Sequence, residues 1–212
     1  ADPQLCCNVA RNVALQADGH VLVAGYFSQA GGTSHSFLAR YSSSGVFDAT
    51  FPASLPPGPI DSGMTVGPDG SIYVAGGYPT SDHTDTRLVS KLTSAGALVD
   101  SYDDLHTDCC ANTFALQPNG KLLIGGNFQQ LGDQPRHALA RLNADGTLDS
   151  TFADLAFSFD ATNPNGSIFG IAAQADGKVL AVGNFTLVGA RPRQYAARVV
   201  TGDVVVSRLS GQ

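Results

Sequence analysis

Four cysteines in two adjacent pairs are the residues whose type and spacing most directly suggest chemistry. The pairs are Cys6-Cys7 and Cys109-Cys110. Four cysteines allow three disulfide connectivities, which include a ring within each dipeptide and bridges between the two pairs. Four thiolates would also suit zinc, but zinc motifs usually separate their cysteines by roughly two to four residues. We therefore expect structural disulfides at these four positions, with a metal site or reactive thiols as the alternatives.

The acidic residues and histidines form no catalytic pattern. All 18 acidic residues are aspartate, so zinc protease and deaminase motifs that depend on glutamate are excluded. The five histidines are scattered, and no nucleophile elbow, phosphate-binding loop or dinucleotide-binding glycine motif is present. The sequence thus predicts no enzyme, no catalytic residue, no metal and no cofactor. A hydrolytic or metal-binding function is the alternative.

The overall composition argues against some classes of partner and favours one cellular location. The formal net charge is -6 and no long basic run occurs, which argues against nucleic acid as a partner. No apolar run approaches the roughly 18 residues of a membrane span, so we expect no membrane insertion. Low lysine content, abundant serine and threonine, and paired cysteines favour an extracellular or cell-surface location.

The strands that must position these residues occur in four copies. The sequences NVALQADGHVLVAGYF, GMTVGPDGSIYVAGGY, TFALQPNGKLLIGGNF and GIAAQADGKVLAVGNF each place an Asp-Gly or Asn-Gly pair between two apolar segments. Such a pair supports the positive φ of a hairpin turn. A second hairpin pattern follows each first one after a loop. The predicted repeats cover residues 12–51, 63–102, 113–152 and 170–209.

The second strand of each repeat is apolar throughout, so both of its faces must be covered. Sheets stacked radially as blades meet this requirement. We therefore predict an all-β fold, a β-propeller with four blades of four antiparallel strands, in a single domain over residues 1–212. A β-sandwich and a β-solenoid are the alternatives. The linker 153–167 contains Phe157 and Phe159, which we expect to fill the core or a gap between blades.

One long pattern resembles a known family. The run ALQPNGKLLIGGNF…RHALARLNADGTLDSTF within residues 115–152 resembles the delta-60 repeat, a propeller-type repeat of bacterial surface and secreted proteins. The resemblance extends over nearly all of residues 12–209 and implies a propeller fold and a surface location. It carries no catalytic residues. The kelch repeat is the second resemblance because of its length and double glycine, although this chain lacks tryptophan.

The first and third repeats carry an Arg and an Asp at matching positions of the outer hairpin. These are Arg40 with Asp48 and Arg141 with Asp149, whereas the second and fourth repeats have valine at the Asp position. The simplest interpretation is a cross-strand ion pair that contributes about 0.2–1 kcal/mol to stability.

The loops between the two hairpins of each repeat are the predicted binding surface, since loops on a rigid scaffold commonly carry function. Guanidinium groups there suit the carboxylate or sulfate groups of a glycan or protein partner. The sequence therefore predicts a non-enzymatic extracellular binding or adhesion module with an unidentified protein or glycan partner. A purely structural repeat module of a bacterial surface protein is the alternative. The candidate ligand-binding residues are His35, Arg136, His137, Arg191 and Arg193.

Overall fold

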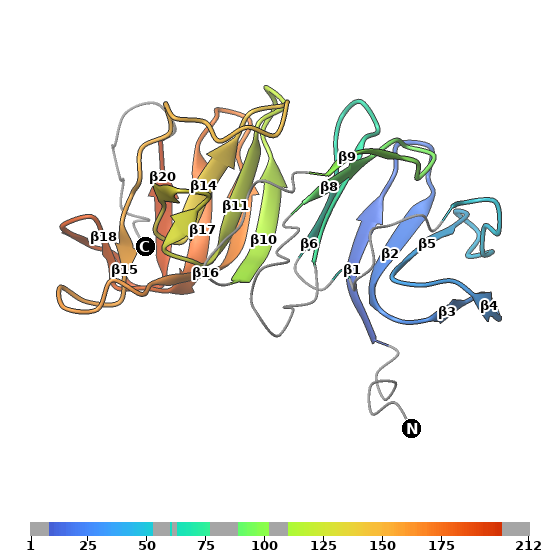
Figure 1. Cartoon of the computed structure of the whole chain (residues 1–212), viewed down its shortest axis with the longest axis horizontal. Helices are drawn as coiled ribbons and strands as arrows, with labels where there is room; N and C mark the ends of the chain where they lie inside the picture. The colour runs from blue at the N-terminus through green and yellow to red at the C-terminus, as the bar shows by residue number, and fades with distance from the viewer. Residues whose placement is uncertain (1–8, 53–59, 61–62, 77–88, 102–109, 201–212) are drawn as a thin grey trace, which may run out of the picture. The chain divides into compact units, whose positions relative to one another are not determined.

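The structure is a computed structural model that describes residues 9–52, 60, 63–76, 89–101 and 110–200. The chain divides into two compact units, residues 1–103 and 104–212, and each unit contains two of the predicted repeats (Figure 1). The described residues form strands, turns and loops, and none of them forms a helix long and apolar enough to cross a membrane. The placement of all residues in one domain stays a prediction.

Unit 1 contains two antiparallel sheets and a small hairpin. The second repeat forms a four-stranded sheet, whereas the sheet of the first repeat has three strands. The strands of the first repeat are β1 (Val9–Leu15), β2 (Val21–Tyr26) and β5 (Leu38–Tyr41), with β3 (Gln29–Ala30) and β4 (Thr33–Ser34) as a hairpin in the loop. The second repeat consists of β6 (Gly63–Val66), β7 (Ile72–Ala75), β8 (Ser90–Leu92) and β9 (Leu98–Ser101).

Unit 2 also contains two main antiparallel sheets, each with three strands among the described residues, and one short strand from a linker. The third repeat consists of β10 (Cys110–Leu116), β11 (Leu122–Asn127) and β14 (Leu139–Leu142), with the hairpin β12 (Gln130–Leu131) and β13 (Gln134–Pro135). The fourth consists of β16 (Ser167–Ala173), β17 (Val179–Asn184) and β20 (Ala196–Val199). The linker strand β15 (Phe157–Ser158) pairs with the hairpin of β18 (Leu187–Val188) and β19 (Arg191–Pro192).

The hairpin turns predicted from the Asp-Gly and Asn-Gly pairs are confirmed. The turn glycine has a φ of 88° at Gly19 and of 80° in each of the other three repeats. Only the glycine of each pair has positive φ, which is the geometry of a type I turn followed by a left-handed residue. In the first turn the Asp18 carboxylate accepts a hydrogen bond from the backbone N–H of His20, and this local bond favours a short acidic side chain.

The fourth strand differs from the prediction in the first and third repeats, where it shrinks to a single bridge. Tyr41 pairs with Phe47, and Leu142 pairs with Leu148. The chain turns directly afterwards because the Asp48 carboxylate accepts bonds from the N–H and hydroxyl of Thr50, and this local turn competes with a longer ladder. The last strand predicted for the fourth repeat, within 201–209, lies outside the described residues.

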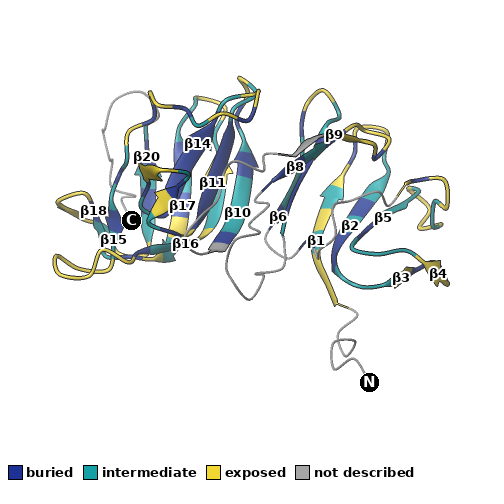
Figure 2. Ribbon diagram, in the orientation of Figure 1, coloured by how far each residue is buried: buried dark blue, intermediate teal, exposed yellow. Residues whose placement is uncertain are grey.

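The core of each unit lies between its two sheets. In unit 1, Leu22 and Leu38 of the first sheet pack with Ile72 and Leu92 of the second. In unit 2 the corresponding layer contains side chains of both sheets and of the linker, all of them fully or almost fully buried (Figure 2). The apolar second strands are therefore covered as their composition predicts.

Candidate ligand pocket beside His137

The linker after the third repeat provides one wall of the candidate site. Its strand β15 pairs Phe157 with Val188 and Ser158 with Leu187. The Phe157 ring is fully buried and packs edge-to-face on Phe185, with 4.9 Å between the ring centroids. The expectation that Phe157 fills the core is thus confirmed. The same expectation for Phe159 is wrong, because its ring is exposed.

Ala138, the residue directly before strand β14, adopts a left-handed backbone conformation that recurs in three repeats. Ala138 has a φ of 65°, and the aligned residues Phe37 and Tyr195 have φ values of 68° and 63°. The N–H of Ala138 donates to the carbonyl of Phe128, and its carbonyl accepts from the N–H of Gly126. A non-glycine residue in this region is strained, and these bonds hold it there. His137 directly precedes this bend in the third repeat.

Asp154 fixes the orientation of His137. One carboxylate oxygen accepts hydrogen bonds from the backbone N–H groups of His137 (3.0 Å) and Ala156 (3.1 Å). The other oxygen lies 2.5 Å from the His137 Nδ1 atom. With Nδ1 bound to the carboxylate, Nε2 is the ring nitrogen that can meet a ligand. Asp154 therefore ties the loop of the third repeat to the linker and orients the imidazole.

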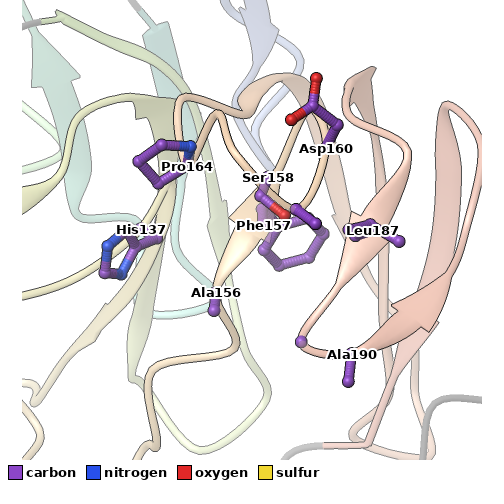
Figure 3. A pocket seen from close by; sticks show the side chains of 10 residues that line it. His137, Ala156, Phe157, Ser158, Asp160, Pro164, Leu187 and Ala190 are labelled. Carbon is purple, nitrogen blue, oxygen red and sulfur yellow. The ribbon is translucent and has the colours of Figure 1, made fainter.

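These residues border an open cavity of about 530 Å³ (Figure 3). Its apolar lining includes Ala156, Phe157, Pro164, Leu187 and Ala190. Its polar lining consists of His137, Ser158 and Asp160. Most of the lining comes from the linker and from the β18–β19 hairpin, so the cavity depends on the pairing of β15 with β18. An apolar wall with a few polar groups is the usual composition of a ligand pocket.

The linker turn holds Asp160 in its charged form. One carboxylate oxygen accepts hydrogen bonds from the N–H and hydroxyl of Thr162, each 2.7 Å long, and from the N–H of Asn163 at 2.8 Å. The Thr162 hydroxyl bond and the two backbone bonds lower the pKa of Asp160. The rim of the pocket therefore carries a fixed negative charge near neutral pH.

The pocket is braced where the linker meets the fourth repeat. The Thr186 hydroxyl donates a hydrogen bond to the carbonyl of Phe159. The N–H of Gly189 lies 2.9 Å from the carbonyl of Leu155 and 3.1 Å from that of Ala156. These bonds fix both ends of the linker wall.

The predicted ligand-binding residues belong to both units. His35 lies in unit 1, where its ring packs edge-on against Phe47 at 5.2 Å. The other four lie in unit 2, and among them only His137 lines the pocket. Arg136 is buried, and its Nη1 donates to the carbonyl of Pro135 at 2.7 Å, so it is not the surface cation that the sequence predicts. The Nε atom is also shielded from solvent, and the guanidinium donates to the backbone of its own loop.

Arg191 and Arg193 lie at the β18–β19 hairpin. Arg191 pairs with Val188 in the short ladder and is exposed. The Nη1 of Arg193 donates to the carbonyl of Pro192 at 2.6 Å. The loop 79–87 of the second repeat lies outside the described residues, and the predicted gathering of all four loops on one face stays a prediction.

The predicted ion pairs of the odd repeats are present. Arg40 Nη2 lies 2.6 Å from Asp48 Oδ2, and Arg141 Nε lies 2.7 Å from Asp149 Oδ2. Each guanidinium also stacks over a phenylalanine ring, at 4.6 Å in the first repeat and 4.7 Å in the third. Lys121 Nζ joins Asp149 at 2.7 Å. These contacts assign the pairs a structural role.

Hydrogen bonding keeps both carboxylates ionised. The Thr50 hydroxyl and the Arg40 guanidinium lower the pKa of Asp48 to about 2. At Asp149, burial alone raises the pKa, but hydrogen bonds from Lys121, Thr151 and Arg141 outweigh it and the pKa falls well below its usual range.

The cysteine prediction falls largely on residues without a described structure. Cys6, Cys7 and Cys109 lie outside the described residues, and Cys110 is placed as the first residue of β10, opposite Asn127. The disulfides stay a prediction. Within the described part of the chain, no group of three or more histidine, cysteine or acidic side chains is arranged to hold a metal ion.

Sequence reasoning missed Asp154, Ser158, Asp160 and Pro164. No periodic pattern covers them, because they belong to the linker between two repeats. The available signal was the length of that linker and its Asp-x-Thr and Asn-Pro turn sequences, since long ordered loops often carry function.

Comparison with protein families supports a β-propeller family. The family described as "Domain of unknown function (DUF5122) beta-propeller" matches residues 16–51, 117–152 and 174–199. These segments belong to the first, third and fourth predicted repeats. The more specific delta-60 resemblance stays a prediction. No curated protein sequence matches the chain.

Solved structures show the same fold at low sequence identity. The chain is similar to a gluconolactonase from Xanthomonas campestris, with a TM-score of 0.55, 15% identity, and coverage of 93% of this chain and 61% of that one. It is similar to the WD40 β-propeller domain of Doa1, with a TM-score of 0.52, 14% identity, and coverage of 83% and 47%. It is also similar to a protein of unknown function from Bacteroides caccae, with a TM-score of 0.52, 11% identity, and coverage of 94% of this chain and 59% of that one. The chain thus spans about half to three fifths of these structures, and the likeness shows an all-β propeller fold.

Proposed function

We propose that the chain is a non-enzymatic binding module, in which the four repeats are four propeller blades and the pocket of unit 2 receives a group from a glycan or protein partner. The pocket beside His137 is the observation that carries this proposal. The paired cysteines and the low lysine content support a location outside the cell or on a bacterial surface.

The size and lining of the pocket favour a small amphipathic group. A volume of about 530 Å³ lies within the range of small-molecule sites. The apolar wall suits the C–H face of a sugar ring or an apolar side chain. His137, Ser158 and Asp160 can exchange hydrogen bonds with hydroxyl or amide groups at the rim. A sugar unit of a glycan uses both features at once and is our first choice of ligand.

A hydrolytic function is the second candidate, because the Asp154 carboxylate lies 2.5 Å from the His137 imidazole. Such a pair can act as a general base. The gluconolactonase among the similar structures shares the fold at 15% identity, which transfers no activity. Asp154 also accepts two backbone N–H bonds, and this structural use of the carboxylate favours binding over catalysis.

The test compares variants of the full chain on a glycan array and in pull-downs from surface-protein extracts. Ala190→Phe should fill the pocket from an exposed position, and His137→Ala should remove its imidazole. Each should weaken binding by about tenfold or more. Ala175→Phe is the matched control, because Ala175 is an exposed residue of the β16–β17 turn and does not line the pocket.

Three results would distinguish the candidates. Binding that both pocket variants retain would exclude the pocket as the binding site. Absence of any bound glycan or protein would leave the structural repeat module as the better interpretation. Hydrolysis of a simple lactone by the wild-type chain, lost in His137→Ala, would replace binding with the hydrolytic function.

A further inference from the structure

The polar side chains of the pocket beside His137 differ in what they offer a ligand. The Ser158 hydroxyl can donate and accept hydrogen bonds, whereas the ionised Asp160 carboxylate accepts them. Among the described residues, no lysine or arginine lines the pocket. The fixed charge of the described lining is therefore negative and belongs to Asp160.

The linker turn uses one oxygen of Asp160 and leaves the other available. Oδ1 accepts the hydrogen bonds from Thr162 and Asn163 that close the turn. No hydrogen bond from the described part of the chain reaches Oδ2. Because Asp160 is exposed at the rim (Figure 3), this oxygen can accept a hydrogen bond from a group that enters the pocket from solvent.

Several other aspartates of the turns and outer hairpins have a basic partner within the chain. Each of these carboxylates lies within ion-pair distance of a basic side chain: Asp18 with His20, Asp48 with Arg40, Asp149 with Arg141 and Asp176 with Lys178. Asp160 has no such partner among the residues that the structure describes. A cationic group on a ligand would supply a counter-charge and a charge-assisted hydrogen bond.

The apolar wall restricts which molecule can carry that cation. Ala156, Pro164 and Leu187 belong to this wall, so the ligand must combine apolar surface with a charge. The narrow stem of a lysine side chain would fill only part of a cavity of about 530 Å³. A sugar ring has a broad C–H face, and its hydroxyl groups can bond with Ser158 and His137. These features favour a sugar ring over a peptide side chain as the carrier of the cation.

We propose that the pocket binds an amino sugar, with the ring on the apolar wall and the ammonium group at the Asp160 carboxylate. This inference rests on the proposed function, because it names the ligand class of the same pocket. At an exposed carboxylate, an ammonium group should be preferred over a hydroxyl on the same ring carbon by about threefold to fivefold. Because the rim is open to solvent, this preference should shrink as the salt concentration rises.

Two arginines near the pocket carry the opposite charge. Arg191 follows the lining residue Ala190 and is exposed, and Arg136 precedes His137 and is buried. Neither arginine lines the pocket, and solvent and salt weaken the effect of charges that do not contact the ligand. We therefore expect the direct contact with Asp160 to determine the charge preference.

The experiment uses tetrasaccharides that share one backbone and differ in a single substituent of each ring. Cellotetraose carries a hydroxyl at the second ring carbon, the chitosan tetramer carries a free amine there, and the chitin tetramer carries an acetamide. Calorimetric titration of the full chain measures each Kd at slightly acidic pH, where the sugar amines are protonated and Asp160 is ionised. The chitosan tetramer should bind about threefold to fivefold more tightly than the other two at low salt.

Asp160→Asn removes the charge and keeps the acceptor of the turn. An amide oxygen can close such a turn, since Asn163 Oδ1 accepts the N–H of Asn165 in the same linker. In this variant the preference for the amine should disappear, while the Kd for cellotetraose should change by less than about twofold. Asp160→Ser, whose hydroxyl also accepts turn bonds, replaces Asp160→Asn if circular dichroism shows that the asparagine variant does not fold.

Asp145→Asn is the matched control for the loss of one negative charge. Asp145 Oδ1 accepts bonds from the N–H and hydroxyl of Thr147, as Asp160 does from Thr162. Asp145 is also exposed, and it does not line the pocket. This variant should therefore keep the preference for the chitosan tetramer.

The outcomes separate the ligand class from the proposed function. Loss of the amine preference in Asp160→Asn but not in Asp145→Asn supports the inference. Equal binding of the three tetramers, or a preference that persists in Asp160→Asn, overturns it, whereas weaker binding of all three tetramers by Ala190→Phe would still support the pocket as the binding site. Tighter binding of tetragalacturonate, lost in Arg191→Gln, would assign the charge preference to Arg191 and overturn the inference.

A chain that binds none of the tetramers would also overturn the amino-sugar inference. The proposed function would then be decided separately by the glycan array and the pull-downs, because these contain ligands without an amine.

Discussion

The ion pairs of the first and third repeats should respond unequally to the same substitution. Asp149 is 3% exposed in its side chain and binds both Arg141 and Lys121. Asp48 is 17% exposed and binds Arg40 alone among the cations of the described residues. Replacing each aspartate with asparagine keeps the shape and removes the charge, so the pair of variants compares two environments for one chemical change.

The expected cost is larger in the third repeat. Asp149→Asn leaves the buried Arg141 guanidinium without a counter-charge. The uncharged amide would then face the two cations, Arg141 and Lys121. Breaking a buried pair in this way costs about 3–4 kcal/mol. Asp48→Asn should cost about 1–2 kcal/mol, because Arg40 is nearer to water and keeps a 3.2 Å hydrogen bond to the carbonyl of Ser94.

Urea unfolding at pH 7 measures the loss of unfolding free energy in both variants. Tyrosine fluorescence is a suitable probe, since the chain has six tyrosines and no tryptophan, and far-UV circular dichroism provides a second probe. The melting temperature of Asp149→Asn should fall by roughly 8–12 °C. The double variant Arg141→Met with Asp149→Asn should recover part of this loss, because an apolar side chain can replace a buried ion pair.

Equal costs for the two variants, or a larger cost for Asp48→Asn, would refute the reasoning from burial. A double variant that is less stable than Asp149→Asn alone would show that Arg141 stabilises the chain mainly through packing on Phe152, and the charge argument would fail.

Three further predictions concern acid stability, packing and cysteine chemistry. The pKa of Asp48 falls from 3.8 in the unfolded reference to about 2 in the fold. The ionised carboxylate therefore stabilises the fold fully above pH 4, and this stabilisation is lost as the pH falls toward 2. Between pH 7 and pH 2, the urea midpoint should decline less in Asp48→Asn than in the wild type. Gly125→Val should destabilise the fold by about 2–4 kcal/mol, because a Cβ at Gly125 would lie 2.7 Å from Ile168 and 2.9 Å from Thr113. A Cβ at Gly170 would meet only Val182, at 3.1 Å, so Gly170→Ala should cost less than about 1 kcal/mol. Equal losses of unfolding free energy in urea would contradict this prediction. Counting thiols in denaturant should find none before reduction and four after it, and four free thiols before reduction would exclude the disulfides.

The hairpins and ion pairs could be predicted because their causes are local. An Asp-Gly or Asn-Gly pair supplies the one positive φ that each turn needs, as at Gly19 and Gly120. Arg40 and Asp48 are eight residues apart across one outer hairpin, so their contact follows from the hairpin itself. The same logic predicted four sheets from four copies of one pattern.

The pocket could not be predicted because its wall depends on a long-range pairing of only two residues. Phe157 and Ser158 pair with Val188 and Leu187, and a two-residue strand has no periodicity to detect. Arg136 was expected at the surface, but its neighbours bury it. Side-chain burial at a loop depends on what other segments cover it, and a single local pattern contains no such information.

The repeated bend separates the scaffold from the site. Phe37, Ala138 and Tyr195 share a left-handed conformation and the same pair of hydrogen bonds to the second strand, so the backbone presents the preceding residue alike in three repeats. That residue is serine in the first repeat, His137 in the third and glutamine in the fourth. In the third repeat, the linker that follows places the Asp154 carboxylate against the imidazole. The bend therefore fixes the backbone position of the residue, and the linker adds the carboxylate that contacts its side chain. The bend holds serine and glutamine at this position in two other repeats. We therefore expect His137→Gln to keep the bend and to lose the contact between the imidazole and Asp154.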